Sequence, residues 1–180
     1  MTVLFADIHG FTSISEQLNA EDLVGLLNRY LAAMANAVLA EEGTIDKFLG
    51  DAVMAWFNAP VPQQDHVLRA IRAALAIRQA IRVLHDELSP IFRLSFGIGI
   101  HVGEAVLGLV GTRDRIEYTA ISDDVNTAKR IQEHAGLDQI LLSAATYERV
   151  ADLVEVRPAV EIQVKGKQMP LKIYELIKLR

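Results

Sequence analysis

Cysteine is absent from this sequence of 180 residues. Disulfide scaffolds, thiolate nucleophiles and Cys-based zinc sites are therefore excluded. The absence suits a reducing compartment, and we expect a cytoplasmic location. Positive charge is also in short supply, because 18 Lys and Arg residues face 23 Asp and Glu residues. A duplex-binding protein needs a basic face, so we expect no nucleic-acid partner.

Long hydrophobic runs are missing too. The longest apolar-looking stretch, 31–40, contains Asn36 and has about half of the roughly 20 residues that a membrane span requires. No basic segment followed by an apolar core opens the chain, so we expect neither a signal peptide nor a membrane segment within it. The chain opens directly on a strand-like run from Thr2 to Ala6. We interpret residues 1–180 as one domain excised from a longer protein that also carries regulatory domains.

Hydrophobic residues, in contrast, are abundant. They make up 51% of the chain, which is enough for the core of one domain. The run from Val3 to Ala6 is apolar at every position, which is typical of a strand buried on both faces. Long helices alternating with strands and hairpins predict an α+β fold, with a mixed sheet covered by helices on one side. Strands are expected at 44–49, 52–57, 92–102, 104–110, 140–142, 154–156, 161–164 and 171–176, and helices after Asn19, after Asp65, at 121–132 and at 144–150.

Two aspartates stand where predicted strands end. Asp7 closes the first strand, and Asp51 follows Gly50 at the tip of the hairpin predicted between 44–49 and 52–57. If these ends meet, the paired hard oxygen ligands suit Mg²⁺, which takes its other ligands from water and substrate phosphates. Alternatively, each aspartate is simply a turn-forming residue. Beyond Asp7, the backbone N–H groups around Gly10 and Thr12 either hold an anion or merely begin a helix.

Lys47 is an ammonium group inside a predicted strand. It alternates with Ile45 and Leu49, so we expect these three side chains on one face. A lysine among apolar neighbours must snorkel to water, pair with an acid or donate to a ligand. Asn126 and Arg130 lie four residues apart on a predicted helix and therefore share a face. Such a pair suits phosphate and hydroxyl groups, although it is also common on wet helix surfaces.

Five stretches of the chain closely resemble the catalytic domain of class III nucleotidyl cyclases, the adenylate and guanylate cyclases. Any one stretch is modestly specific, whereas five in family order across essentially the whole chain are strongly so. The resemblance implies a ferredoxin-like core with class III cyclase architecture, acting as a homodimer with composite active sites at the interface. The stretches are FADIHGFT (5–12), DKFLGDAVMAWF (46–57), GIGIHVGEAVLGLVG (97–111), YTAISDDVNTAKRIQ (118–132) and VKGKQMPLKIYEL (164–176).

The resemblance also implies roles for single residues. Asp7 and Asp51, helped by the backbone carbonyl of Ile8, would hold two Mg²⁺ or Mn²⁺ ions per active site. The partner protomer would supply Asn126 to position the ribose and Arg130 to stabilise the α-phosphate in the transition state. Further substrate-binding residues would be Gly10, Phe11, Thr12 and, near the C-terminus, Lys165, with Lys167 as the less favoured alternative.

Base choice would fall to Lys47 and Thr119, which match the base-reading positions of the family. Lys47 can only donate a hydrogen bond and Thr119 can accept one, which suits N1 and the 6-amino group of adenine. Guanylate cyclases that resemble this chain carry a carboxylate at position 47. Thr119 stands where animal adenylate cyclases have an aspartate. Because a hydroxyl can also donate, the sequence leaves the strictness of ATP over GTP open.

The sequence therefore predicts an adenylate cyclase with ATP as its substrate. The ribose 3′-hydroxyl would attack the α-phosphate with the help of two metal ions, giving 3′,5′-cyclic AMP and pyrophosphate. One alternative is a catalytically silent module that binds nucleotide, dimerises and regulates. Another is a metal-dependent phosphohydrolase that uses Asp7 and Asp51 and gives Lys47 no role.

Overall fold

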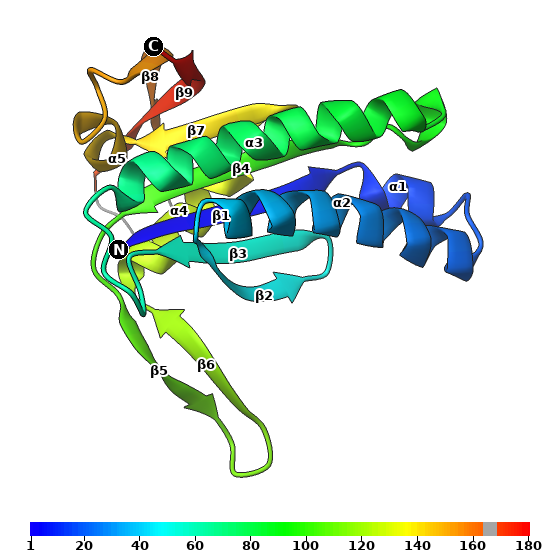
Figure 1. The fold of residues 1–180 in the computed structure, drawn as a ribbon, viewed down its shortest axis with the longest axis horizontal. Helices are drawn as coiled ribbons and strands as arrows, with labels where there is room; N and C mark the ends of the chain where they lie inside the picture. Colours follow the sequence, from blue (N-terminus) through cyan, green and yellow to red (C-terminus); the bar gives the residue numbers. More distant parts are fainter. Residues whose placement is uncertain (164–168) are drawn as a thin grey trace.

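A seven-stranded sheet forms the body of the protein in the computed structural model, which describes residues 1–163 and 169–180 (Figure 1). All neighbouring strands are antiparallel except β4 and β7, so the sheet is mixed, as predicted. The order across the sheet is β2-β3-β1-β4-β7-β9-β8. The strands are β1 (Thr2–His9), β2 (Thr44–Leu49), β3 (Ala52–Phe57), β4 (Ser95–Val102), β7 (Gln139–Ser143), β8 (Val154–Ile162) and β9 (Leu171–Leu179).

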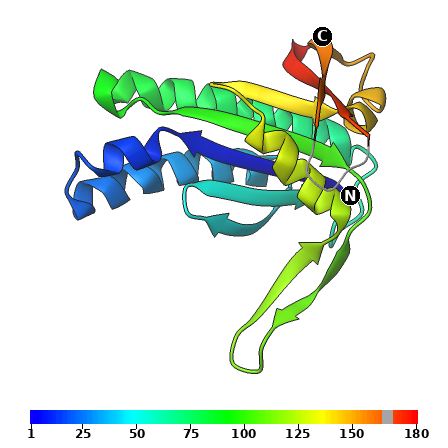
Figure 2. The same ribbon diagram turned by 180° about the vertical axis from the view of Figure 1, so that it is seen from behind.

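Helices cover both faces of the sheet, and the expectation that they cover one side is wrong. The long helices α2 (Ala20–Ala40) and α3 (His66–Glu87) lie side by side on one face (Figure 1). Helix α4 (Asp123–Glu133) crosses the opposite face and packs against β1 and β4 (Figure 2). The short elements are α1 (Phe11–Ser15), the 3₁₀ helix η1 (Pro90–Phe92) and α5 (Ala144–Glu148).

The composition of β1 explains why a second layer is needed. Leu4 and Ala6 belong to the core beneath α2 and α3, whereas Val3 and Phe5 belong to a second core with Ala128 of α4. Successive side chains of a strand point to opposite faces. A strand that is apolar at every position therefore leaves an apolar face uncovered unless helices pack on both sides.

Helix α2 is long and apolar enough, by length and composition alone, to cross a membrane. In this fold it packs against α3 and the sheet, and Tyr30 and Met34 on its inner face are fully buried. The Asn19 side chain caps its first turn by accepting from the backbone N–H of Asp22 at 2.9 Å. These features are those of a core helix.

Several predicted boundaries shift in the structure. The helix expected at 121–132 begins at Asp123, because the Ser122 side chain caps it by accepting from the N–H of Val125. The preceding residues form strand β6 (Ile116–Ile121), which the sequence analysis missed. The strand expected at 92–102 starts at Ser95, after η1. The expected strands at 154–156 and 161–164 merge, up to Ile162, into β8.

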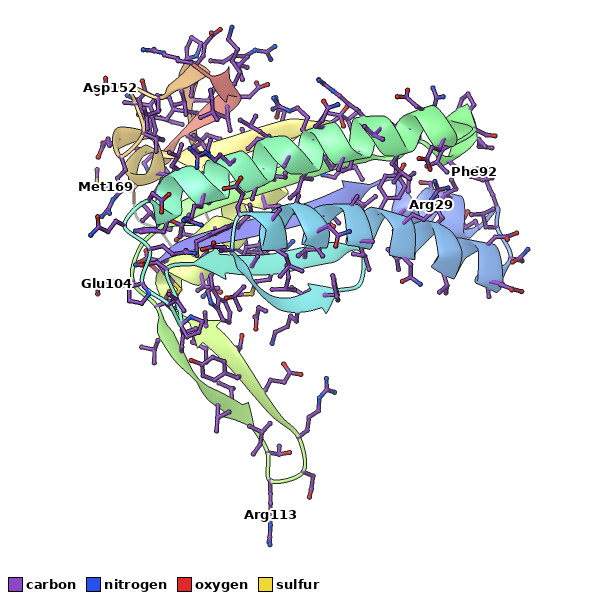
Figure 3. All side chains as sticks on the ribbon, in the orientation of Figure 1. Arg29, Phe92, Glu104, Arg113, Asp152 and Met169 are labelled. Carbon is purple, nitrogen blue, oxygen red and sulfur yellow. The ribbon has the colours of Figure 1, made fainter. Side chains whose placement is uncertain are left out.

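A two-stranded hairpin of β5 (Val106–Gly111) and β6 stands away from the sheet (Figures 1 and 3). Its tip, marked by Arg113 in Figure 3, points away from the body of the protein. Several of its apolar side chains are more than half exposed, among them Val106, Leu109 and Tyr118. An isolated hairpin is marginally stable in water, so these side chains form a surface that gains stability when it is covered.

Candidate active site

Asp7 and Asp51, the carboxylate pair, are brought side by side by the pairing of β1 with β3. Asp7 lies opposite Ala52, the residue that follows Asp51. Asp51 occupies the β2–β3 turn, where Gly50 adopts a φ of 67° that L side chains rarely tolerate. The backbone N–H of Ile8 donates to the carbonyl oxygen of Asp51 at 3.2 Å, which ties the turn to the end of β1.

The backbone carbonyl of Ile8 points to the same side. In an antiparallel ladder the N–H and C=O groups of one residue face the same neighbour. Because the N–H of Ile8 faces the Asp51 turn, its carbonyl is also directed toward that turn. The structure therefore brings together the three residues expected to hold metal ions.

Electrostatics at the carboxylate pair favour a cation. Burial, and then the negative charge of Asp7, raise the pKa of Asp51 above its ordinary value. A divalent cation between the two carboxylates would offset both the cost of burying the Asp51 charge and its repulsion by Asp7. Among residues 1–163 and 169–180, no group of three or more His, Cys, Asp or Glu side chains is arranged so that it could hold a metal ion by itself. Two carboxylates and one carbonyl leave positions for water and phosphate oxygens, a donor set that fits Mg²⁺ or Mn²⁺.

Gln132 is a neighbour of Asp7 that the sequence analysis did not single out. Its amide nitrogen donates to Oδ2 of Asp7 at 3.3 Å, and its amide oxygen accepts from Lys129 Nζ at 2.6 Å. The side chain is almost fully buried on the inner face of α4. A signal was available, since Gln132 continues the helical spacing of the buried residues Val125 and Ala128. A polar residue in such a stripe needs a polar partner.

Lys47 and Ile45 do not share a face, contrary to the expectation. A β-bulge lies between them, so that Ile45 pairs with Ala55 while Lys47 pairs with Met54. Adjacent residues of β3 face opposite sides of the sheet, and Met54 belongs to the core on the α4 side. The extra residue of a bulge shifts the alternation by one position. Lys47 is thereby turned toward the side on which the β5–β6 hairpin lies.

Lys47 and Thr119, called the reader pair after the role expected from the sequence, lie on β2 and β6 where these strands face each other. Lys47 Nζ donates to Oε2 of Glu117 at 2.6 Å, and Thr119 Oγ1 donates to Oδ2 of Asp46 at 2.7 Å. Lys47 Nζ also lies 3.9 Å from that same Asp46 oxygen. Hydrogen bonds from Lys47, and then from Arg115, lower the pKa of Glu117, so this carboxyl is ionised at neutral pH.

Asn126 and Arg130 share the outer face of α4, as predicted. Asn126 is exposed, and the Arg130 side chain is 41% exposed and pairs with Glu133 at 2.8 Å. Within the part of the chain that the structure describes, neither is hydrogen-bonded to Asp7 or Asp51. Gln132, on the inner face of the same helix, makes the contact with Asp7 instead.

Gly10 and Thr12 follow the carboxylate pair closely. Gly10 precedes α1 with a φ of 88°, a left-handed conformation, and no side chain caps this helix. Phe11 and Thr12 form its first turn, so their backbone N–H groups lie just beyond the end of β1. Lys165, the remaining candidate, falls outside the described residues.

Known proteins resemble this chain in both sequence and fold. A family profile described as adenylate and guanylate cyclase catalytic domain matches residues 1–178. "Adenylate cyclase 1" of Rhizobium meliloti is 37% identical over 98% of this chain, which spans 27% of that relative's length. The adenylyl cyclase CyaB from P. aeruginosa has a TM-score of 0.93 and 37% identity, with 99% of this chain and 94% of that chain covered.

The guanylyl cyclase Cya2 is nearly as similar, with a TM-score of 0.92 and 36% identity over 99% of this chain and 92% of that chain. Since an adenylyl and a guanylyl cyclase resemble it almost equally, the fold does not decide the nucleotide, and individual side chains must. The match over residues 1–178, together with relatives 37% identical over nearly the whole chain, shows that this chain belongs to the family of adenylate and guanylate cyclase catalytic domains.

Proposed function

We propose that this domain is an adenylate cyclase that converts ATP to 3′,5′-cyclic AMP and pyrophosphate at composite sites of a homodimer. The observation that carries the proposal is the carboxylate pair, placed with the Ile8 carbonyl at the end of β1. The adenylate cyclases among its relatives favour the same activity. The chain spans 27% of the length of the Rhizobium meliloti relative.

Asp7, Asp51 and the Ile8 carbonyl would hold two Mg²⁺ or Mn²⁺ ions. Bound there, the ions would lower the pKa of the ribose 3′-hydroxyl and neutralise charge on the phosphates. Gln132 keeps Asp7 in place through its hydrogen bond to Oδ2. The N–H groups of Phe11 and Thr12, after the turn at Gly10, would lie against phosphate oxygens. Lys165 would meet the terminal phosphates.

Arg130 would stabilise the charge that gathers on the α-phosphate oxygens in the transition state, and Asn126 would orient the ribose. Arginine presents planar, forked donors that match phosphate geometry. Both side chains sit on the outer face of α4, while the carboxylate pair lies beyond its inner face. A second copy of the chain would complete the site by bringing its own outer face to the nucleotide.

The β5–β6 hairpin supports a homodimer. Val106, Leu109 and Tyr118 expose apolar surface on an arm that has little support from its own chain. Covering this surface with a partner would remove apolar area from water and stabilise the arm. Thr119 lies on that arm, so dimerisation would also fix the reader pair in position.

The reader pair favours ATP. Lys47 donates to an acceptor, as N1 of adenine is, and its side chain is 29% exposed, so a ligand can reach it. Guanine presents an N–H at the same position, which would face another donor. A silent binding module would use the same readers without turnover, and a phosphohydrolase would release inorganic phosphate.

Product analysis separates these functions. Purified protein is incubated with ATP or GTP in parallel, with Mn²⁺ or Mg²⁺, and cyclic nucleotide, pyrophosphate and phosphate are quantified. We expect cyclic AMP and pyrophosphate in equal amounts, with much less product from GTP. Bound ATP without cyclic AMP at high protein concentration would establish the silent module, and free phosphate in place of pyrophosphate would establish the phosphohydrolase.

A further inference from the structure

Asp46 is a buried acid that neither the metal chemistry nor the base contacts employ. It is the extra residue of the β2 bulge, and its side chain is 0% exposed. Oδ2 accepts from Thr119 at 2.7 Å, whereas Oδ1 is buried with no hydrogen-bond partner in residues 1–163 and 169–180. Burying an incompletely paired carboxylate is costly, so its presence calls for a reason.

The contact with Asp46 determines how Thr119 can bond. An ionised carboxylate only accepts hydrogen bonds, and a threonine hydroxyl has one proton and two acceptor lone pairs. With its proton given to Asp46, the Thr119 oxygen can only accept from a third group. A free threonine would rotate to donate or to accept, as the ligand required.

Space is available beside this hydroxyl. Gly108 lies directly across the hairpin from Thr119, and a Cβ added to it would meet nothing within 4 Å. A glycine inside a strand often marks a place where a ligand comes close to the backbone. Lys47 Nζ lies 3.9 Å from the Asp46 oxygen that holds Thr119, so donor and acceptor face the same region.

We propose that Asp46 is a positioning residue: it accepts the hydroxyl proton of Thr119, so that the Thr119 oxygen can only accept a hydrogen bond from the base. Asp46 thereby selects adenine over guanine. The inference rests on the proposed function. The 6-amino group of adenine donates to the Thr119 oxygen, while O6 of guanine is an acceptor and would face lone pairs. A free hydroxyl could bind either purine by donating or by accepting. The contact with Asp46 leaves only acceptance, which matches the purine with a donor at position 6.

The test compares kcat/KM for ATP and for GTP in four proteins: wild type, Asp46→Ala, Thr119→Val and the double variant. Freeing the hydroxyl should lower the ATP-to-GTP ratio of Asp46→Ala about tenfold, mainly through better use of GTP. In the Thr119→Val background, Asp46→Ala should leave the ratio unchanged, because Asp46 acts through the hydroxyl. Asp46→Asn keeps an acceptor oxygen of the same shape and should lose less of the preference than Asp46→Ala.

A merely structural role for Asp46 predicts a different result. If Asp46 only holds β2 and β6 together, its loss would lower kcat/KM for ATP and for GTP by the same factor. An unchanged ATP-to-GTP ratio in Asp46→Ala would therefore overturn the inference. An effect of equal size in the Thr119→Val background would overturn it too. If Asp46→Ala does not fold, as judged by its circular dichroism and thermal melt, the ratio is measured in Asp46→Leu, which keeps side-chain volume but offers Thr119 no acceptor, and a ratio equal to wild type again overturns the inference.

These outcomes are distinct from failure of the proposed function. That function fails if wild-type protein makes no cyclic AMP. The inference alone fails if wild type makes cyclic AMP, Thr119→Val alters the nucleotide ratio, and Asp46→Ala does not.

Discussion

The carboxylate pair and the reader pair share one hairpin, with Lys47 only four residues before Asp51, yet they are held differently. Asp7 lies on β1, which is paired on both sides by β3 and β4. Lys47 lies on the edge strand β2, beside a bulge, and Thr119 lies on a hairpin that stands off the sheet. One member of the carboxylate pair, Asp7, thus rests on a strand paired on both sides, whereas Lys47 and Thr119, expected to contact the base, lie on an edge strand and a projecting hairpin.

This difference suggests how nucleotide choice can change within one fold. A substitution at an edge strand or a projecting hairpin disturbs few packed neighbours, whereas one at the central strand disturbs two cores. The adenylyl cyclase CyaB and the guanylyl cyclase Cya2 resemble this chain almost equally. We therefore expect changes at the carboxylate pair to abolish turnover, and changes around the reader pair to redirect it.

The largest effect is expected for Asp51→Ala, which should leave no measurable cyclic AMP, because half of the carboxylate pair is lost. Arg130→Ala should lower kcat on the order of 10²–10³-fold by removing a donor to the transition state. Mixing the two variants should restore activity, since each retains what the other lacks. Random pairing makes about half of the dimers mixed, each with one intact site of two, so about a quarter of wild-type activity is expected.

The control for this mixture is each variant mixed with itself at the same total concentration. Native mass spectrometry of differently tagged chains shows whether mixed dimers form. A mixture that stays inactive although mixed dimers are present would disprove the shared site.

At the reader pair, Lys47→Glu should lower kcat/KM for ATP by about 10²-fold or more, because a donor to N1 of adenine becomes an acceptor. Use of GTP should rise relative to ATP. Lys178→Glu, an exposed charge reversal on β9, controls for the change in net charge. Both are measured by initial rates with each nucleotide, and unaltered ATP kinetics in Lys47→Glu would remove Lys47 from base reading.

A smaller effect is expected when Lys47 is released from its ion pair. Glu117→Gln removes a competitor for the lysine, and ion pairs between exposed side chains contribute little. The KM for ATP should therefore fall by no more than about fivefold. Arg115→Gln is the matched control, since it removes the other partner of Glu117 and leaves Lys47 paired. A higher KM in Glu117→Gln would mean that Glu117 orients Lys47 for the base.

The smallest effect concerns stability without metal. The raised pKa of Asp51 means that its folded state favours the protonated carboxyl, a contribution lost as pH rises through that pKa. Near neutral pH, Asp51→Asn should raise the Tm of metal-free protein by about a few degrees, and the difference should shrink as pH falls. Mn²⁺ should raise the Tm of wild type more than that of Asp51→Asn. Scanning calorimetry with and without EDTA measures both, and equal Mn²⁺ effects would place the metal elsewhere.

The carboxylate pair could be predicted because its geometry follows from local rules. An apolar run ending in Asp7 and a Gly50–Asp51 turn between two alternating stretches specify where each strand ends. Antiparallel pairing then brings the two ends together. The prediction needs only one fact that is not local, namely that these strands are neighbours in the sheet. The resemblance to a family implies that fact.

The surroundings of the reader pair could not be predicted, since they depend on a bulge and on a tertiary contact. Strict alternation placed Lys47 with Ile45, and the bulge at Asp46 reversed that assignment. Two adjacent charged residues within an apolar strand, Asp46 and Lys47, were the available signal. The contact of β2 with β6 joins residues that are 70 positions apart in the pair Lys47–Glu117 and 73 apart in the pair Asp46–Thr119, and β6 itself is not predicted from the sequence.

The second helical layer is not among the predictions, although the apolar run of β1 indicates a strand buried on both faces. A strand of that kind requires cover on each side, and α4 supplies it. In the sequence, this helix stands out only by the outward residues Asn126 and Arg130. Its inward residue Gln132 escaped notice because an amide in an amphipathic helix looks like surface until the helix is placed.

The two faces of helix α4 carry groups with separate tasks in the proposed dimer. Gln132 donates a hydrogen bond to Asp7 of its own chain. Arg130 lies half a turn earlier, on the outer face, and in the proposed dimer it would face the substrate bound by the other protomer. Any roll of this helix would move both contacts at once. In the proposed dimer we therefore expect occupancy of one active site to influence the other through a shift of this helix.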